Sequence, residues 1–281
     1  MDLKFFRYFS KLLIILLSST VSISHAKDAY TWMVVPQFTG IAVHRDWSPI
    51  LQALEKATGY HFELKLSKSI PEFEIAFSEG GPDFAYMNPY HSVMARKAQG
   101  YEPIIRDNKR KLKGILVVRK DSKVNSIQDL QGGKIAFPSP NAFAASLYIR
   151  ALLSEQEKIK FTPIYAKTHT NSYRYVLLNK TPASGGVFRT LKRERSEVQN
   201  NLKVIYKTPS SPSHPIVVHK RVSSDVAIKV QKAIISLANT KEGKVLLKAV
   251  LIPNPIDTSF ERDYKALQDL NLKKYVVHHA K

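Results

Sequence analysis

The stretch Lys134–Arg150, KIAFPSPNAFAASLYIR, decides the fold class. Its first four residues favour a strand, a loop with two prolines follows, and the residues from Asn141 onward favour a helix. A strand that passes through a tight loop into a helix is the building unit of α/β proteins. The first N–H groups of such a helix lack partners and attract negative charge. The alternative is a plain helix start capped by Ser139 or Asn141.

The same unit recurs along the chain. AYTWMVVP predicts a first strand, and an amphipathic helix follows, with apolar residues at Trp47, Ile50, Leu51 and Leu54. Further strands are expected at YHFELKLS, at DFAYM and around Ile104, and a second series begins at Gly114. Two series of alternating strands and helices predict an α/β protein with two lobes and mainly parallel sheets. Ligands of such sheets bind beyond the carboxyl ends of the strands, which here means between the lobes.

Residues 1–26 have the features of a cleavable export signal. Three cations precede the apolar run LLIILL, and SISHA provides small residues for cleavage after Ala26. The apolar core is too short to span a bilayer comfortably. We therefore expect a secreted, periplasmic protein with about 255 folded residues.

The composition narrows the possible functions. The absence of cysteine excludes disulfides, thiol catalysis, iron–sulfur clusters and a lipid anchor on cysteine. The net charge is +20, or about +18 without the leader, and such a field attracts anions. No arginine-rich motif with interleaved aromatic residues is present, so we expect no nucleic acid partner. A solvated basic surface, steering of a small anion and a basic coat on an anionic surface remain open.

No pattern typical of an enzyme occurs. The chain lacks a Gly-x-Ser-x-Gly elbow, a phosphate-binding glycine-rich loop with lysine, and a His-Glu-x-x-His motif. His214, His219, His278 and His279 do not have metal-ligand spacing. We predict a protein that is not an enzyme and has no metal or cofactor.

Four pieces of the chain occur in a characteristic order. VVPQFTG follows the leader, and PDFAYMNPYHSVMARKAQGYEPI follows in the first lobe. GILVVRKDSKVNSIQDLQGGKIAF lies at the crossover and THTNSYRYVLLNKTPASGGV in the second lobe. In this order the chain resembles the periplasmic substrate-binding proteins of phosphate, phosphite and phosphonate ABC transporters. The resemblance covers residues 30–237.

The resemblance implies a two-lobed type 2 periplasmic binding fold that closes on a small oxyanion like a flytrap. It places residues 27–114 and 211–281 in the first lobe and residues 115–210 in the second. GILVVRK and SHPIVVHK are then the two hinge strands, and the C-terminal helices return to the first lobe. We expect a monomer.

In the first lobe, the resemblance draws attention to the loop after DFAYM. The family commonly has Gly-Pro and a tyrosine there, and this chain has Asn88, Pro89 and Tyr90. Tyr86 and Tyr90 are candidates to donate a phenol to the ligand, with strand core and helix start as the alternatives. Asn88 fits a helix cap as well as a ligand contact. Gln37, after the first strand, is another candidate.

In the second lobe, the opening stretch aligns with the family's phosphate loop, in which Ser-Thr-Ser hydroxyls and helix-start amides hold the oxyanion. Here the hydroxyl trio is absent, and the backbone amides remain. Asn141 can cap or donate, and Phe143 brings a large apolar face. The candidates from this segment are Ser139, Asn141, Ala142 and Phe143.

Two more candidates follow in the second lobe. His169 lies near a family histidine and can donate to an oxyanion; if it titrates near neutrality, affinity falls as the pH rises. Arg189 stands after SGGVF, in the neighbourhood where aminoalkylphosphonate binders have a carboxylate. A guanidinium there argues for a second anionic group on the ligand and against a cationic tail. A solvent-exposed side chain is the alternative for each.

Two functions remain open. The first is a transport receptor that captures a small anion and delivers it to an ABC permease. The second is a periplasmic sensing protein whose closed form docks on a membrane sensor such as a histidine kinase. The missing hydroxyl trio and Arg189 are the reasons for keeping the second.

Overall fold

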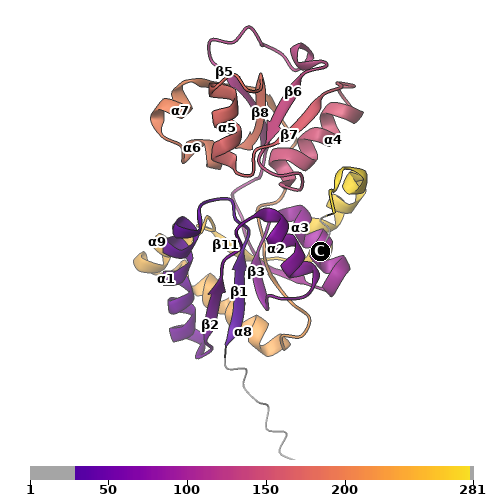
Figure 1. The fold of residues 1–281 in the computed structure, drawn as a ribbon. Coiled ribbons are helices and arrows are strands. Elements are labelled where there is room, and N and C mark those ends of the chain that lie inside the picture. The colour runs from indigo at the N-terminus through magenta and orange to yellow at the C-terminus, as the bar shows by residue number, and fades with distance from the viewer. Residues whose placement is uncertain (1–28, 279–281) are drawn as a thin grey trace, which may run out of the picture.

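The chain forms two lobes joined by two connecting segments, and each lobe is built on its own β-sheet with helices around it (Figure 1). The computed structural model describes residues 29–278. The predicted export signal at residues 1–26 lies outside the described residues. The predicted two-lobed α/β architecture is confirmed. None of the described helices combines the length and apolar character that a membrane crossing requires.

The first lobe holds the beginning and the end of the described chain. Its strands and helices are β1 (Tyr30–Val34), α1 (Gly40–Thr58), β2 (Phe62–Lys65), α2 (Ile70–Ser78), β3 (Phe84–Tyr86), α3 (Pro89–Gln99), β4 (Glu102–Asp107), β10 (Ile216–Val218), α8 (Ser224–Leu237), α9 (Lys241–Ala249) and β11 (Pro255–Asp257). A π-helix at Phe260–Tyr264 and two 3₁₀ segments, η4 (Lys265–Leu270) and η5 (Leu272–Tyr275), follow. The strand order is β11-β4-β10-β3-β1-β2.

The second lobe holds the middle of the chain. Its elements are β5 (Gly114–Arg119), η1 (Gln128–Leu130), β6 (Lys134–Phe137), the π-helix η2 (Phe143–Leu147), α4 (Tyr148–Glu155), β7 (Thr162–Tyr165), α5 (His169–Leu177), β8 (Ala183–Val187), α6 (Phe188–Lys192), α7 (Ser196–Asn200) and β9 (Leu202–Lys207). The strand order is β7-β6-β8-β5-β9.

Both sheets are mixed, whereas the sequence pattern predicts mainly parallel ones. β1 pairs in parallel with β2 and β3, but β10 runs antiparallel between β3 and β4. In the second sheet β6 is parallel to β7 and β8, but β5 is antiparallel to β8 and β9. The reason is the connection between lobes: β5 and β10 enter their sheets from the other lobe, at the end toward which the parallel strands run.

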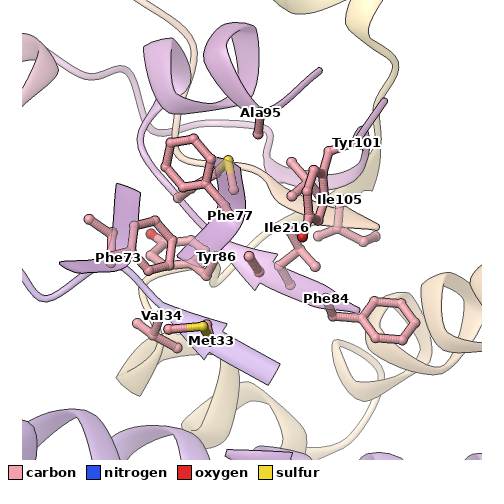
Figure 2. Close-up of a cluster of buried hydrophobic side chains, with 14 of the residues drawn as sticks. Met33, Val34, Phe73, Phe77, Phe84, Tyr86, Ala95, Tyr101, Ile105 and Ile216 are labelled. Atoms are coloured by element: carbon pink, nitrogen blue, oxygen red, sulfur yellow. The ribbon is translucent and has the colours of Figure 1, made fainter. Parts of the chain in front are cut away.

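The hydrophobic core follows this arrangement. Figure 2 shows part of the first-lobe core, where Phe73 and Phe77 of α2 lie near Tyr86 of β3. In the second lobe β5 is buried on both faces, because Leu116 and Val118 belong to one cluster, and Ile115 and Val117 to the other. This explains why GILVV is continuously apolar and does not alternate.

The two connecting segments are residues 108–113 and 208–215. They pair through Leu112 and Ser211, whose backbone groups exchange two hydrogen bonds of 2.9 Å each. The predicted hinge strands GILVVRK and SHPIVVHK start just beyond this pairing and form β5 and β10 inside the two sheets. The joint between the lobes is therefore shorter than the sequence suggests.

Candidate ligand-binding site

The site is built around the helix start that follows β6. The chain leaves Phe137, passes through the proline loop and enters the π-helix η2, which continues as α4. The N–H groups of Ser146 and Leu147 both donate to the carbonyl oxygen of Ala142, at 2.8 and 3.2 Å. Within residues 29–278 no acceptor pairs with the N–H groups of the residues before them, Phe143, Ala144 and Ala145. These three open amides create a partial positive charge at one spot.

Two glycines fix the position of the open amides. A Cβ atom on Gly114 of β5 would lie 1.9 Å from the carbonyl oxygen of Ala144, and one on Gly185 of β8 would lie 2.1 Å from that of Ala145. Any larger residue therefore pushes the helix start away from the sheet. Gly114 and Gly185, which the sequence pattern indicates only as strand residues, therefore allow the binding helix to pack directly against the sheet.

A small cavity of about 20 Å³ lies against these amides, between the lobes. Its walls come from both lobes and from the joint between them: Val35, Gln37, Ile70, Asn88, Leu112, Ala142, Phe143, Ala144, Ala145, His169, Val187 and His214. Its walls contain backbone amides, neutral polar groups and apolar side chains, and no carboxylate.

His169 stands at the boundary of this cavity and is buried, with only 4% of its surface exposed. Its Nδ1 lies 3.3 Å from Oγ1 of Thr190. Burial, together with the positive charge of Arg189, lowers the pKa of His169 to about 3. The imidazole is therefore neutral at ordinary pH, and the condition of titration near neutrality, on which a fall of affinity with rising pH depends, is not met.

Arg189 reaches from α6 across to the first lobe. Its Nη2 donates to Oε1 of Gln37 at 2.7 Å and to a ring nitrogen of His214 at 2.8 Å, and its Nη1 lies 3.4 Å from the hydroxyl of Tyr86. Burial and Arg189 lower the pKa of His214 well below its ordinary value, so His214 is a neutral acceptor. Arg189 thus binds two residues of the cavity wall and adds a positive charge next to that wall.

A larger cleft of about 1210 Å³ lies outside the cavity, and Gln37 and His169 belong to the walls of both. Its charged wall residues are Arg45, Lys68, Lys167, Arg174, Glu194, Arg193 and Arg195. Arg193 also crosses the gap, where it forms an ion pair of 3.3 Å with Asp46 and lies over the ring of Phe38. Because six of these seven wall residues are cationic, the entrance attracts anions.

The structure brings five of the ten sequence candidates to the cavity wall. They are Gln37, Asn88, Ala142, Phe143 and His169. The other five are not among the wall residues. Tyr86 and Arg189 contact each other, as described, and Tyr90 stacks on Phe143 across the lobes, with ring centroids 6.0 Å apart.

Ser139 and Asn141 also lie outside the cavity wall. The hydroxyl of Ser139 is buried and has no partner among the described residues. The side chain of Asn141 contacts Glu74 at 2.8 Å and the backbone of Val277 at 2.7 and 3.0 Å. Neither side chain caps the helix start, so neither competes for the open amides.

Sequence reasoning missed His214, Leu112 and the open amide of Ala145. The spacing of His214 along the sequence bears only on metal binding. Within residues 29–278 no group of His, Asp, Glu or Cys side chains is placed to hold a metal ion. Their position could have indicated a role, because His214 and Leu112 lie where the chain crosses between the lobes, next to the cleft.

The fold and the site together define a two-lobed binding protein with an anion-attracting cleft. A model of the family "ABC transporter, phosphonate, periplasmic substrate-binding protein" matches residues 32–264. The chain belongs to this family of periplasmic substrate-binding components, which are not enzymes by their family role.

Solved structures agree in fold. PhnD1 from Prochlorococcus marinus in complex with methylphosphonate has a TM-score of 0.79 at 15% identity, covering 89% of this chain and 99% of that one. A binding protein of an ABC phosphonate transporter from Pseudomonas aeruginosa has a TM-score of 0.77 at 15% identity, covering 87% and 85%. XAC2383 from Xanthomonas citri bound to ATP has a TM-score of 0.74 at 12% identity, covering 90% and 100%. A search of curated protein sequences finds no match.

Proposed function

We propose that this protein captures a phosphonate or a related small oxyanion between its lobes and delivers it to an ABC permease. The observation that carries the proposal is the set of three open amides, Phe143 to Ala145, which face a cavity without a carboxylate. Open helix-start amides stabilise an anion through hydrogen bonds and the helix dipole. Arg189, which contacts Gln37 and His214 of the wall, strengthens the same preference.

The wall chemistry favours a particular kind of ligand. Phe143, Val35 and Val187 offer apolar contact to a small substituent such as a methyl group. No acidic side chain lines the cavity, so an amino group on the ligand has no counter-charge there. The cationic outer cleft suits a second anionic group on a longer ligand. PhnD1, a structural neighbour, binds methylphosphonate, which fits this description.

The remaining expectations belong to the same proposal. Residues 1–26 direct export to the periplasm, and the protein acts as a monomer without catalytic activity or nucleic acid. The sensing alternative is not favoured, since the matching family is described as a transporter component.

Isothermal titration calorimetry on the mature chain tests the ligand. The panel is methylphosphonate, phosphite, phosphate, aminoethylphosphonate and small dicarboxylates. We expect methylphosphonate and the inorganic oxyanions to bind and aminoethylphosphonate to gain nothing from its amine. Binding of aminoalkyl compounds alone contradicts the proposal. Phe143→Ser, which returns a hydroxyl to the helix start, should shift the preference among the ligands; Ile41→Ser, at an exposed position of α1, is the control.

A further inference from the structure

The hydrogen bonds around His169 determine which of its two nitrogens carries the proton. Oγ1 of Thr190 lies 2.9 Å from the carbonyl oxygen of Val187, 2.7 Å from the hydroxyl of Tyr173 and 3.3 Å from Nδ1 of His169. All four residues are buried. The carbonyl oxygen can only accept, and Thr190 is its nearer donor, because the hydroxyl of Tyr173 lies 3.3 Å from the same oxygen. The hydroxyl of Tyr173 then donates to Thr190, its shortest contact.

This arrangement leaves only a lone pair of Thr190 facing His169. Two lone pairs do not form a hydrogen bond, so Nδ1 must carry the proton and donate to Oγ1. The alternative, in which Thr190 donates to Nδ1, breaks the shorter contact with Val187 to make a longer one. Because all of these groups are buried, an unpaired contact is costly, and the first arrangement is favoured.

A neutral imidazole with its proton on Nδ1 has a bare lone pair on Nε2. No partner for Nε2 occurs within residues 29–278, and the ring lines the cavity. The titratable or charged groups that face His169 are Arg189 of α6, His214 of the connecting segment and Tyr173 of its own helix. The cation Arg189 and the burial of the ring both disfavour a second proton on His169. The oxygens of Gln37 and Asn88 are already used, by Arg189 and by the N–H of His91.

We propose that His169 selects the protonated monoanion of the ligand, accepting a hydrogen bond from its P–OH through Nε2 while the amides of Phe143 to Ala145 bind the unprotonated oxygens. This inference rests on the proposed function. It makes His169 a specificity-determining residue that distinguishes two protonation states of one oxyanion.

Methylphosphonate and methanesulfonate provide a matched pair of probes. They have the same shape, but methanesulfonate carries no proton near neutrality, whereas methylphosphonate keeps one until its second ionisation, which falls near neutrality as in phosphate esters. We expect calorimetry at about pH 6 to show methanesulfonate binding roughly 100-fold more weakly, since an acceptor facing an acceptor loses the hydrogen bond and leaves buried lone pairs unpaired. Methylphosphonate affinity should fall about tenfold per pH unit above its second pKa.

Thr190→Val tests the positioning role. Valine keeps the branched shape but removes the acceptor, so His169 can place its proton on Nε2 and donate. We expect methanesulfonate discrimination to shrink about tenfold and the pH dependence to flatten. Thr190→Ser should restore both. If Thr190 had only a structural role, Thr190→Val would lower the affinity for methylphosphonate and for methanesulfonate equally.

The ¹⁵N chemical shifts of the imidazole report the tautomer without any ligand. We expect a protonated Nδ1 and an unprotonated Nε2 in the ligand-free mature chain. A protonated Nε2, or equal binding of the two probes, overturns the inference and leaves the proposed function intact. Failure of methylphosphonate, phosphate and phosphite to bind at every pH overturns the proposed function itself.

Discussion

Two helix starts in this molecule have an asparagine in similar loops but use it differently. In the first lobe, Asn88 caps α3 in the usual way: its Oδ1 accepts the N–H of His91 at 2.7 Å, with Pro89 at the first helical position. In the second lobe, Asn141 precedes the π-helix without capping it, and its amide pairs with Val277 and Glu74. In α3 a side chain from the helix start itself accepts one of the first N–H groups, whereas in the π-helix η2 the first N–H groups have no side-chain acceptor among the described residues.

The difference teaches that a capping residue does not by itself close a helix. Val277 lies in the C-terminal segment, which returns beside α4 (yellow in Figure 1), where the backbone carbonyl of Tyr275 accepts from Arg150 at 2.7 Å. Asn141 forms two hydrogen bonds with the backbone of Val277, so its side-chain oxygen does not compete with a ligand for the open amides. The closed start contributes stability, and the open one is free to bind a ligand.

Gly185→Ala should have the largest effect, because it displaces the helix start that carries the open amides. The added Cβ would overlap the carbonyl oxygen of Ala145, so the helix start must move. We expect the free energy of unfolding to fall by about 3 kcal/mol, measured by chemical denaturation, and methylphosphonate binding to be lost. Gly40→Ala, where the Cβ would lie 3.6 Å from its nearest neighbour, is the control and should be near neutral. Unchanged methylphosphonate binding in Gly185→Ala would contradict the role of Gly185 in positioning the open amides.

The same substitution at both asparagines tests the comparison directly. Asn141→Asp places a carboxylate against that of Glu74 and should cost about 2 kcal/mol of stability at neutral pH. Asn88→Asp keeps an equally good cap and should cost about 1 kcal/mol or less, through its 3.3 Å contact with the carbonyl oxygen of Asn141. Thermal denaturation of both variants provides the measurement. Equal losses would show that the two asparagines have the same role.

Acid should weaken the region around the open start. The folded pKa of His169 is about 3, below its unfolded value near 6.5, so the unfolded state takes up a proton first. The stability is therefore fully present above about pH 6.5 and is lost as the pH falls toward 3. Between about pH 7.5 and pH 5.5, His169 should account for about 1 kcal/mol of the loss. His169→Gln should lack this part of the loss in denaturation curves, whereas His61→Gln, at an exposed histidine, should retain it.

Val277→Pro should allow Asn141 to cap the π-helix, as Asn88 caps α3. Proline removes the N–H that donates to Oδ1 of Asn141, at a cost of less than about 1 kcal/mol. Asn141 is then free to accept from an amide of the π-helix, as Asn88 does in α3. We expect methylphosphonate affinity to fall a few-fold, because the side chain and the ligand compete for the same N–H. An unchanged Kd would show that the C-terminal segment does not control the open amides.

Local pattern was enough to predict much of the fold and part of the site. The alternation of strands and helices, the two lobes and the helix start after KIAF follow from short-range periodicity and turn residues. Pattern alone predicted that loops at strand ends meet at the ligand, and the family resemblance selected residues within them. Of these candidates, Gln37, Asn88, Ala142, Phe143 and His169 line the cavity.

The sequence by itself determined which segments are strands and helices and which ends of them meet, because hydrophobic spacing reports local burial. Only the tertiary structure decided which amides stay open, which nitrogen of His169 holds the proton and that His214 joins the wall. Those outcomes depend on hydrogen-bond partners such as Asn141 and Val277, which are 136 positions apart, and on glycines that matter only when a helix is packed against them. No local pattern encodes such pairings, since they exist only once the lobes and the C-terminal segment are assembled.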